Sequence, residues 1–293
     1  MPPDPLAQPS RPPSTRVLMA DPEHFDVTYV INPHMAGHVG TVDRDLARAQ
    51  WEALRQVYLQ LGLQVDVLPA VPGFPDLVFV ANQTFPTQPR QGPPAVILSH
   101  MHAAERRGEV PIVARWFREQ GWQLLDVPEQ PRDGIMGSHF EGMGDANWHP
   151  GRRLVYGGYG WRTARRAYED RLHLIDAEVV TLELQDVRLY HLDTCVSPLD
   201  EHTALICDAA FSERGLAALS ACFPRLIRAP VDEAMELLAV NGHCPDGKHF
   251  VVQRGAVRTV ALVREAGFEV IEVDTSEFLK SGGSVQCMKL MLD

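Results

Sequence analysis

The sequence predicts a mixed α/β fold built from a repeated unit of helix, turn and strand. Three stretches carry this pattern: an amphipathic helix ends at Gly62, Gly121 or Gly267, and an alternating strand follows each glycine. Glycine just after a helix is the expected left-handed cap, and period-two alternation is typical of a half-buried strand. Fainter copies are centred on Asp176 and Cys222. The five anchors recur about every 45–60 residues, a spacing typical of solenoids, propellers and other repeat arrays.

The remaining elements follow from the same kind of pattern. Residues 1–15 are rich in proline and predict a flexible tail, so we expect a single folded domain over residues 16–293. Apolar runs at residues 95–98, 153–156 and 204–207 predict further strands between the anchors. Residues 74–82 predict another apolar strand with polar ends. On this pattern alone, a repeat array and an open α/β sheet are equally good interpretations.

The composition narrows the class of protein. With 45% hydrophobic and 22% charged residues over 293 positions, the chain has the balance of a soluble globular protein. Its formal net charge of −11 argues against a nucleic-acid partner, which needs clustered Lys and Arg. No apolar run reaches the roughly 18 residues of a membrane span, and the N-terminus does not have the pattern of a signal peptide. We therefore expect no membrane partner and a cytoplasmic protein.

The sequence carries no clear cofactor or metal pattern. Its five cysteines are widely spaced and odd in number, which indicates a reduced compartment rather than a disulfide framework. Neither G-x-G-x-x-G nor G-x-x-x-x-G-K-[ST] occurs, so we expect no nucleotide cofactor. A zinc site made from His191, Cys195, His243 and Cys244 is an alternative on residue type, but the spacing is not that of structural zinc sites. We predict neither a cofactor nor a metal.

Cys287 is the residue best suited to chemistry. It closes the segment SGGSVQC at residues 281–287. A cysteine after such a turn has backbone N–H groups near its sulfur, and these could stabilise the nucleophilic thiolate. The plainer alternative is a small buried apolar residue, which is the commoner role of a free cysteine.

Two further segments could complete a site around Cys287. His191 and Asp193 are two residues apart, so both would point into one pocket if the chain were extended there. Glu141 and Asp145 flank two glycines that would let the backbone turn closely around a ligand. Taken singly, a surface histidine beside a capping aspartate and a solvated turn are the commoner explanations.

The chain resembles the guanidino-group-modifying superfamily in a set of residues that occur together and in order: Asp76, Asn82, Glu141, His191, Asp193 and Cys287. That superfamily includes arginine deiminase, dimethylarginine dimethylaminohydrolase, arginine:glycine amidinotransferase and arginine dihydrolase. The resemblance covers the chain from about Met19 onward. It implies a five-bladed α/β propeller, a pentein, with pseudo-fivefold ββαβ repeats, and so favours the repeat-array interpretation.

Within this superfamily the sequence looks most like the arginine dihydrolase branch, on residues 25–35, residues 140–145 and Asn82. Deiminases and dimethylarginine hydrolases usually carry an aspartate where Asn82 stands. An amide can both donate and accept hydrogen bonds, so it could hold a guanidinium and later a neutral urea. We therefore expect Asn82 to permit a second round of hydrolysis that yields ornithine.

The resemblance also implies roles for the site residues. Cys287 would attack the guanidinium carbon and form a covalent thiouronium intermediate. His191 would protonate the departing nitrogen and then activate water, while Glu141 orients it. The substrate-binding residues implied are Asp193 and Asp76 for the guanidinium nitrogens, Arg162 and Arg106 for the α-carboxylate, and Asn32 as a second amide in the pocket.

Other functions stay open at this stage. Within the enzyme class, the alternatives are a dimethylarginine dimethylaminohydrolase and an amidinotransferase. From another class, a ribosome anti-association factor uses the same propeller only for binding. That function predicts a missing nucleophile, so Cys287, His191 and Glu141 together count against it. The expected partner is a small guanidino molecule, and a homo-oligomer is left open.

Overall fold

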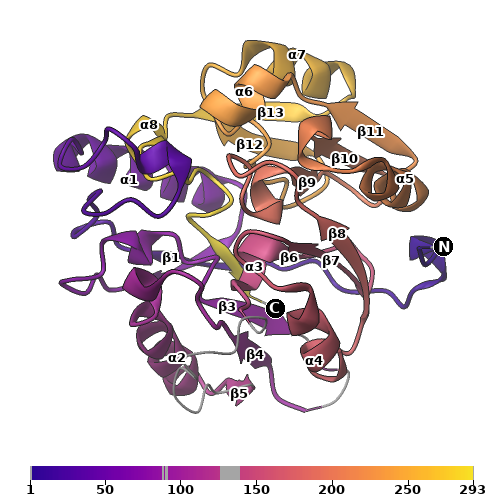
Figure 1. The fold of residues 1–293 in the computed structure, drawn as a ribbon, viewed down its shortest axis with the longest axis horizontal. Coiled ribbons are helices and arrows are strands. Elements are labelled where there is room, and N and C mark those ends of the chain that lie inside the picture. The colour runs from indigo at the N-terminus through magenta and orange to yellow at the C-terminus, as the bar shows by residue number, and fades with distance from the viewer. Residues whose placement is uncertain (1, 88, 90–91, 126–138, 293) are drawn as a thin grey trace.

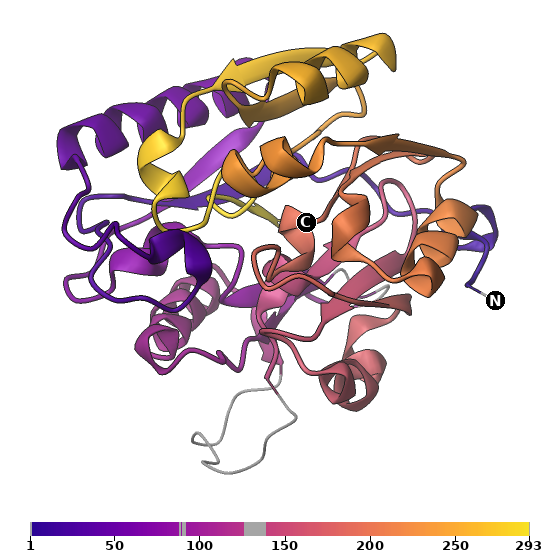
Figure 2. The ribbon, with the colours of Figure 1, turned by 45° about the horizontal axis from the view of Figure 1, so that its top comes forward.

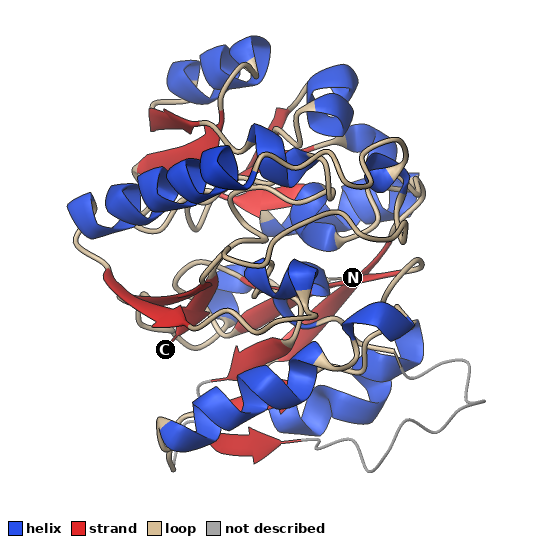
Figure 3. Cartoon of the chain, turned by 90° about the vertical axis from the view of Figure 1, so that its left-hand side faces the viewer, coloured by secondary structure: helices blue, strands red, loops and turns tan. Residues whose placement is uncertain are grey.

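The computed structural model describes residues 2–87, 89, 92–125 and 139–292. Over these residues the chain forms five small sheets, four with three strands and one with two. Figure 3 shows the strands as short, separate groups with helices beside them. The mixed α/β prediction is therefore confirmed, and the open-sheet interpretation is wrong. None of the helices in the described ranges is long and apolar enough to cross a membrane.

Three of the sheets share one arrangement. A first strand pairs antiparallel with a second, a helix follows, and a third strand pairs parallel with the second. The three units are β3 (Thr84–Thr87), β4 (Ala95–Leu98), α2 (Glu109–Glu119) and β5 (Gln123–Leu125); β6 (Ala146–Trp148), β7 (Leu154–Tyr159), α4 (Arg165–Ile175) and β8 (Glu178–Glu183); and β9 (Val196–Pro198), β10 (Thr203–Ile206), α5 (Glu213–Cys222) and β11 (Arg225–Arg228). This is the ββαβ order that the resemblance implied.

The first sheet joins the two ends of the chain. Its central strand β1 (Arg16–Ala20) is followed by α1 (Arg44–Gln60) and by β2 (Gln64–Leu68), which pairs parallel with β1. The last strand of the chain, β14 (Leu290–Leu292), takes the place of the first strand and pairs antiparallel with β1. The same ββαβ unit is therefore completed across the termini.

The fifth unit has a reduced first strand. β12 (His249–Gln253) pairs parallel with β13 (Glu269–Val273) across α7 (Val257–Glu265). A single antiparallel bridge between His243 and Val251 stands where the first strand would be. Figure 1 shows the five sheets in chain order around the molecule. The short helices α3 (Gly142–Asp145), α6 (Val231–Glu236) and α8 (Ser276–Leu279) lie in the connections.

Four of the five predicted anchors have the expected left-handed backbone. Gly62, Gly121 and Gly267 have φ angles of 83°, 81° and 101°, and Asp176 has a φ of 47°. Glycine adopts this region at little cost, and aspartate tolerates it. Cys222 differs because it is the last residue of α5, and its successor Phe223 has an extended φ of −121°.

Three clusters of buried apolar side chains tie neighbouring sheets together. One cluster includes side chains from β1, β4 and β7, a second includes side chains from β7, β10 and β12, and a third links β1 with β12 and β13. Every residue of β4 and of β10 is buried. The core is therefore spread between the sheets, and the turns at the ends of the strands are left to carry polar groups.

Two segments that were predicted to be extended are not. Residues 74–82 form a 3₁₀ helix, η3 (Pro75–Val78), followed by irregular backbone rather than a strand. Pro75 begins this helix because its fixed φ suits the first helical position. Leu192–Thr194 form a second 3₁₀ helix, η5, so His191 and Asp193 do not share a face through strand alternation.

The proline-rich segment before β1, predicted as a flexible tail, lies against the unit formed by β6, β7, α4 and β8. The backbone N–H of Arg11 donates to the carbonyl of Gly151 at 2.8 Å, and the Arg11 guanidinium lies 4.8 Å from the centre of the Trp148 ring. The N–H of Arg153 donates to the carbonyl of Pro9 at 2.9 Å. Figure 2 shows the N-terminus at the outer edge of the molecule. These contacts place residues 9–11 beside β6, and the flexibility of residues 1–15 stays a prediction.

Candidate active site

The predicted site residues converge from equivalent places in the repeat. Asn82 stands just before β3, α3 leads directly into β6, and η5 lies just before β9. Cys287 lies just before β14. The turn that precedes the first strand of a unit therefore supplies polar side chains each time, which is why residues far apart in the sequence meet.

Cys287 is 2% exposed, and its sulfur has two polar neighbours. Its Sγ lies 3.2 Å from Oδ2 of Asp193 and 3.2 Å from Nδ2 of Asn241. Burial, together with the Asp193 carboxylate, raises the pKa of the thiol well above its usual value. The thiolate stabilisation expected from the Ser/Gly turn is therefore outweighed in the unliganded site. A cation bound beside Asp193 would lower this pKa again.

His191 lies against a buried carboxylate. Its Nε2 is 2.8 Å from Oε2 of Glu141, and Nη1 of Arg162 donates to the same oxygen at 3.2 Å. Burial alone would raise the pKa of Glu141, but Arg162 and His191 hold it well below its usual range. Oδ2 of Asp145 lies 3.9 Å from the same Nε2, and burial raises the pKa of Asp145 to about 6. A charged Glu141 thus fixes the imidazole ring.

Asp193 faces the nucleophile with one oxygen to spare. The residue is 1% exposed, and its Oδ1 has no hydrogen-bond partner within the described ranges. Burial raises the pKa of Asp193 to about 7. An unsatisfied buried acceptor is costly, so this oxygen is suited to an N–H group of a ligand placed beside Cys287.

Asn82 is oriented by Arg106. Nη1 of Arg106 donates to Oδ1 of Asn82 at 2.8 Å, while its Nη2 binds Glu109 at 2.9 Å. Glu109 also accepts a 2.6 Å hydrogen bond from the side chain of Gln83. The buried Nδ2 of Asn82 has no partner among the residues that the structure describes, and Asn82 borders the site cavity. Asn82 therefore offers a hydrogen-bond donor to the cavity.

The two predicted carboxylate-binding arginines are placed differently. Nη2 of Arg106 also donates to the backbone carbonyls of Asp76 and Phe79, so its guanidinium is largely occupied by protein groups. Arg162 donates to the carbonyl of Ile31 at 2.9 Å, and its guanidinium lies 4.8 Å from the Tyr190 ring centre. Both arginines border the cavity. Their contact with a substrate carboxylate stays a prediction. Arg106 also orients Asn82 through the hydrogen bond to its Oδ1.

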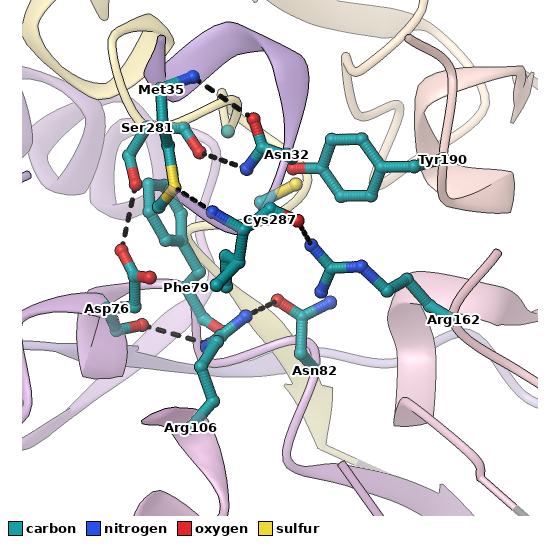
Figure 4. Close-up of a pocket in the computed structure, with 12 residues that line it drawn as sticks. Asn32, Met35, Asp76, Phe79, Asn82, Arg106, Arg162, Tyr190, Ser281 and Cys287 are labelled. Atoms are coloured by element: carbon teal, nitrogen blue, oxygen red, sulfur yellow. Dashed lines mark hydrogen bonds between the residues drawn. The ribbon is translucent and has the colours of Figure 1, made fainter. Parts of the chain in front are cut away.

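Asp76 and Asn32 are also engaged by the protein. Asp76 accepts hydrogen bonds from the hydroxyls of Tyr29 and Ser281, at 2.9 and 2.8 Å. Asn32 accepts from the N–H of His34 at 2.9 Å and donates to the carbonyl of Ser281 at 3.0 Å. Figure 4 shows both side chains next to Ser281 at one side of the cavity. Their predicted substrate contacts stay predictions.

A small cavity lies beside Cys287, and His191, Glu141 and Asp193 are not among the described residues that line it. Its volume is about 10 Å³, which is roughly the space that one water molecule needs. It is lined by Ile31, Asn32, Met35, Asp76, Phe79, Asn82, Arg106, Arg162, Tyr190, Ser281, Gly283 and Cys287. A guanidino substrate is much larger, so the site must open to admit it.

The sequence interpretation missed two buried polar residues beside Cys287. Asn241 contacts the sulfur, and Lys289 is 1% exposed with a pKa that burial lowers to about 7. Asn241 stands two residues before the His243 bridge, just as Asn82 stands two residues before β3. The repeat itself could therefore have indicated Asn241. A lysine within the apolar run CMKLML was the only sequence signal for Lys289.

The alternative zinc site is not formed within the described ranges. His191, Cys195, His243 and Cys244 do not gather into a group of three or more possible ligands. The sulfur of Cys195 instead contacts the carbonyl of His191 at 3.1 Å, and the His243 ring packs against Tyr58.

Comparison with known proteins adds to this geometry. The sequence profile of the family described as N,N dimethylarginine dimethylhydrolase, eukaryotic, matches residues 32–221. The N(G),N(G)-dimethylarginine dimethylaminohydrolase of Mycobacterium tuberculosis is 37% identical over 287 residues, which cover 97% of this chain and 89% of that protein. The chain belongs to the dimethylarginine dimethylaminohydrolase family.

Other proteins similar to this chain are named as arginine dihydrolases. The bifunctional arginine dihydrolase/ornithine cyclodeaminase ArgZ of Synechocystis sp. is 34% identical over 278 residues, which cover 94% of this chain but 37% of ArgZ. The crystal structure of the N-terminal domain of ArgZ bound to product superposes with a TM-score of 0.85 at 32% identity, covering 95% of this chain and 97% of that domain.

Family membership confirms the predicted superfamily and class of reaction. The chain is a hydrolase that acts on C–N bonds of guanidino compounds. Its relatives carry the names of two such activities.

Proposed function

We propose that this chain hydrolyses L-arginine to ornithine, carbon dioxide and two molecules of ammonia, with citrulline as the intermediate product. The observation that carries the proposal is a pair of buried polar atoms, Oδ1 of Asp193 and Nδ2 of Asn82, which have no hydrogen-bond partner among the residues that the structure describes. A guanidinium has only N–H donors and needs acceptors, which Asp193 supplies. Citrulline has a urea oxygen and needs a hydrogen-bond donor. Asn82 supplies it through Nδ2, because its Oδ1 already accepts a hydrogen bond from Arg106.

In the first round, the guanidinium would pair with Asp193 and lower the pKa of the neighbouring thiol. The Cys287 thiolate would then attack the central carbon, and His191 would protonate the nitrogen that leaves as ammonia. His191 would next take a proton from water, which attacks the thiouronium carbon and releases citrulline. Glu141 supports both steps because its charge stabilises the protonated imidazole.

The second round would repeat this chemistry on citrulline. Attack on the urea carbon builds negative charge on its oxygen, and the Nδ2–H of Asn82 would stabilise that oxygen as in an oxyanion hole. Loss of ammonia, hydrolysis and loss of carbon dioxide would leave ornithine. An aspartate at this position could only accept a hydrogen bond and would repel the developing charge.

For the α-carboxylate of the substrate we propose Arg162, with Asn32 as a second amide in the pocket, while Asp76 would join Asp193 in holding the guanidinium nitrogens. Arg162 borders the cavity, and a guanidinium is the side-chain group that binds a carboxylate through two parallel hydrogen bonds. Each carboxylate oxygen of Asp76 accepts a hydrogen bond from a neutral hydroxyl and keeps a further lone pair for a cationic nitrogen.

A second candidate function is the hydrolysis of asymmetric dimethylarginine to citrulline and dimethylamine. It is favoured by the 37% identity with the Mycobacterium tuberculosis dimethylarginine dimethylaminohydrolase. It needs only one round, so it makes no use of the donor that Asn82 presents.

The deciding experiment incubates the purified chain with L-arginine and quantifies ornithine, citrulline and ammonia, next to Cys287→Ala and Asn82→Asp. We expect ornithine with two ammonia per arginine, no turnover by Cys287→Ala, and accumulation of citrulline by Asn82→Asp. Continued ornithine release by Asn82→Asp would remove the role given to Asn82. Turnover of dimethylarginine alone would favour the second candidate, and transfer of the amidino group to added glycine would indicate an amidinotransferase.

We also propose that the five sheets close into a propeller over residues 16–293. The pairing of β14 with β1 and the apolar cluster that links β1 with β12 and β13 support closure. A cytoplasmic location and a homo-oligomeric assembly stay proposals, to be tested by fractionation and by light scattering.

A further inference from the structure

Asn241 is fully buried and uses its whole hydrogen-bonding capacity. Its Oδ1 accepts from the backbone N–H groups of Ser284 and Cys287, at 3.1 and 3.4 Å. Its Nδ2 donates to the backbone carbonyl of Asp193 at 3.0 Å and lies 3.2 Å from Sγ of Cys287. One amide thus joins the turn that carries the nucleophile to the turn that carries the neighbouring carboxylate.

We propose that Asn241 is a positioning residue that aims the sulfur of Cys287 and stabilises its thiolate through the Nδ2–H group. The proposal rests on the proposed role of Cys287 as the nucleophile. In the resting site the thiol hydrogen is directed at Oδ2 of Asp193, because Nδ2 of Asn241 can only donate to the sulfur. Once the proton has left, the Nδ2–H contact becomes a hydrogen bond to an anion, which is about twice as strong as a neutral one.

None of the charged or titratable groups discussed below is placed to stabilise the Cys287 thiolate as Asn241 is. Asp193 is an acceptor and opposes the thiolate. Burial raises the pKa of Tyr190 well above its usual value, so its hydroxyl stays neutral. Lys289 follows on the same terminal segment, and burial lowers the pKa of its amine to about 7, so it is only partly charged. Arg162 borders the cavity but is bound to other groups.

The same contact would assist both halves of the covalent cycle. When the sulfur bonds to the substrate carbon, its electron pair is shared and the Nδ2–H contact weakens. When water displaces the sulfur, the C–S bond breaks and the electron pair returns to a thiolate that Asn241 can stabilise again. The amide therefore favours the state in which the sulfur carries charge, before attack and after release.

The test follows the rate of alkylation of Cys287 by iodoacetamide between about pH 7 and 12, a range chosen because burial and Asp193 raise the pKa of this thiol well above its usual value. Alkylation is measured on the Cys287 peptide by mass spectrometry without substrate. In Asn241→Ala we expect the midpoint to rise by about one pKa unit, which is a tenfold smaller thiolate fraction below the midpoint. In Asn241→Asp the midpoint should rise further, because a second carboxylate faces the sulfur. The kcat for arginine should fall about tenfold in Asn241→Ala, with KM unchanged.

A matched control is Ser197→Ala. The Ser197 hydroxyl donates to the carbonyl of Gly242 at 3.2 Å, next to Asn241 in the chain. Its removal should leave the alkylation midpoint where it is in the parent protein. Asn241→Asp keeps both acceptor bonds to the backbone, so it serves if Asn241→Ala does not fold. Folding of each variant is verified by circular dichroism.

An alkylation midpoint that is the same in the parent, Asn241→Ala and Asn241→Asp would overturn the inference, even if arginine turnover proceeds as proposed. Shifted midpoints in a protein that turns over no guanidino compound would uphold the inference and reject the proposed function. The alkylation readout needs no substrate, so the two failures are distinguishable.

Discussion

Glu141 lies fully buried between His191 and Arg162, and its charge is compensated by both. Removing one member of a buried ion pair lowers the free energy of unfolding, because the remaining charge stays buried without its partner. The charged residues of this site therefore act as compensated groups rather than as isolated catalytic side chains. The same balance appears at Arg106, whose buried guanidinium is paired with Glu109.

Glu141→Gln should lower the free energy of unfolding by about 3 kcal/mol at pH 7, because Arg162 loses its charged partner. The pKa of Glu141 is lowered in the folded protein, so its stabilising contribution is fully present above the unfolded value of about 4.3. That contribution is lost as the pH falls toward the folded value. The deficit of the variant should therefore shrink below about pH 4. Urea unfolding followed by circular dichroism at several pH values measures it.

A surface ion pair provides the comparison for this prediction. Glu201 binds Arg152 at 2.8 Å, but its side chain is 39% exposed. Glu201→Gln should change the free energy of unfolding by less than about 1 kcal/mol. A deficit of Glu141→Gln that stays the same from neutral to acidic pH would contradict the assignment of a charged Glu141.

At the scale of elements, the 3₁₀ helix η2 (Pro33–Met35) covers the site cavity. Asn32 caps it by accepting from the N–H of His34, and its amide also donates to the carbonyl of Ser281. The side chain of His34 contacts the carbonyl of Arg188 at 2.8 Å. Because the cavity holds only about one water, we expect this short element, which contributes Asn32 and Met35 to the lining, to move when a substrate enters.

Asn32→Ala should raise KM for arginine about fivefold, because loss of the cap costs about 1 kcal/mol of the state in which η2 has closed again over the bound substrate. Asn32→Ser keeps an acceptor for the cap and should stay within about twofold of the parent. Steady-state kinetics on both variants measure the effect. Equal losses in the two variants would instead indicate that Asn32 contacts the substrate directly, as the sequence predicted.

The elements also show where sequence reasoning holds and where it stops. The glycine caps at Gly62, Gly121 and Gly267 were predictable because a helix end has few solutions. The 3₁₀ helix within residues 74–82 was not predictable. A short run of buried apolar residues has no periodicity by which a strand could be told from a fully buried turn. The partners of Asn82 and Cys287 were equally hidden, since hydrogen bonds between distant turns leave no local pattern.

At the scale of the whole molecule, the first and last strands of the described chain pair next to the site. β14 completes the first sheet through β1, and the turn that carries Cys287 leads directly into β14. Placing the nucleophile therefore depends on the last pairing that the chain makes. This explains how a C-terminal cysteine can contact Asp193 of the fourth unit and Asn241 of the fifth.

Leu290→Ala tests this dependence. Leu290 is fully buried and pairs with Leu18 of β1, so the cavity left by truncation should lower the free energy of unfolding by about 3 kcal/mol. Because β14 anchors the preceding turn, Cys287 should also become reactive toward a thiol reagent at a lower urea concentration than Cys222, which lies in α5 of the fourth unit. Leu6→Ala, at a side chain that is 56% exposed, should change stability by no more than about 0.5 kcal/mol. If Cys287 and Cys222 in Leu290→Ala become reactive together, the terminal strand does not open separately, and the five units unfold as one cooperative body.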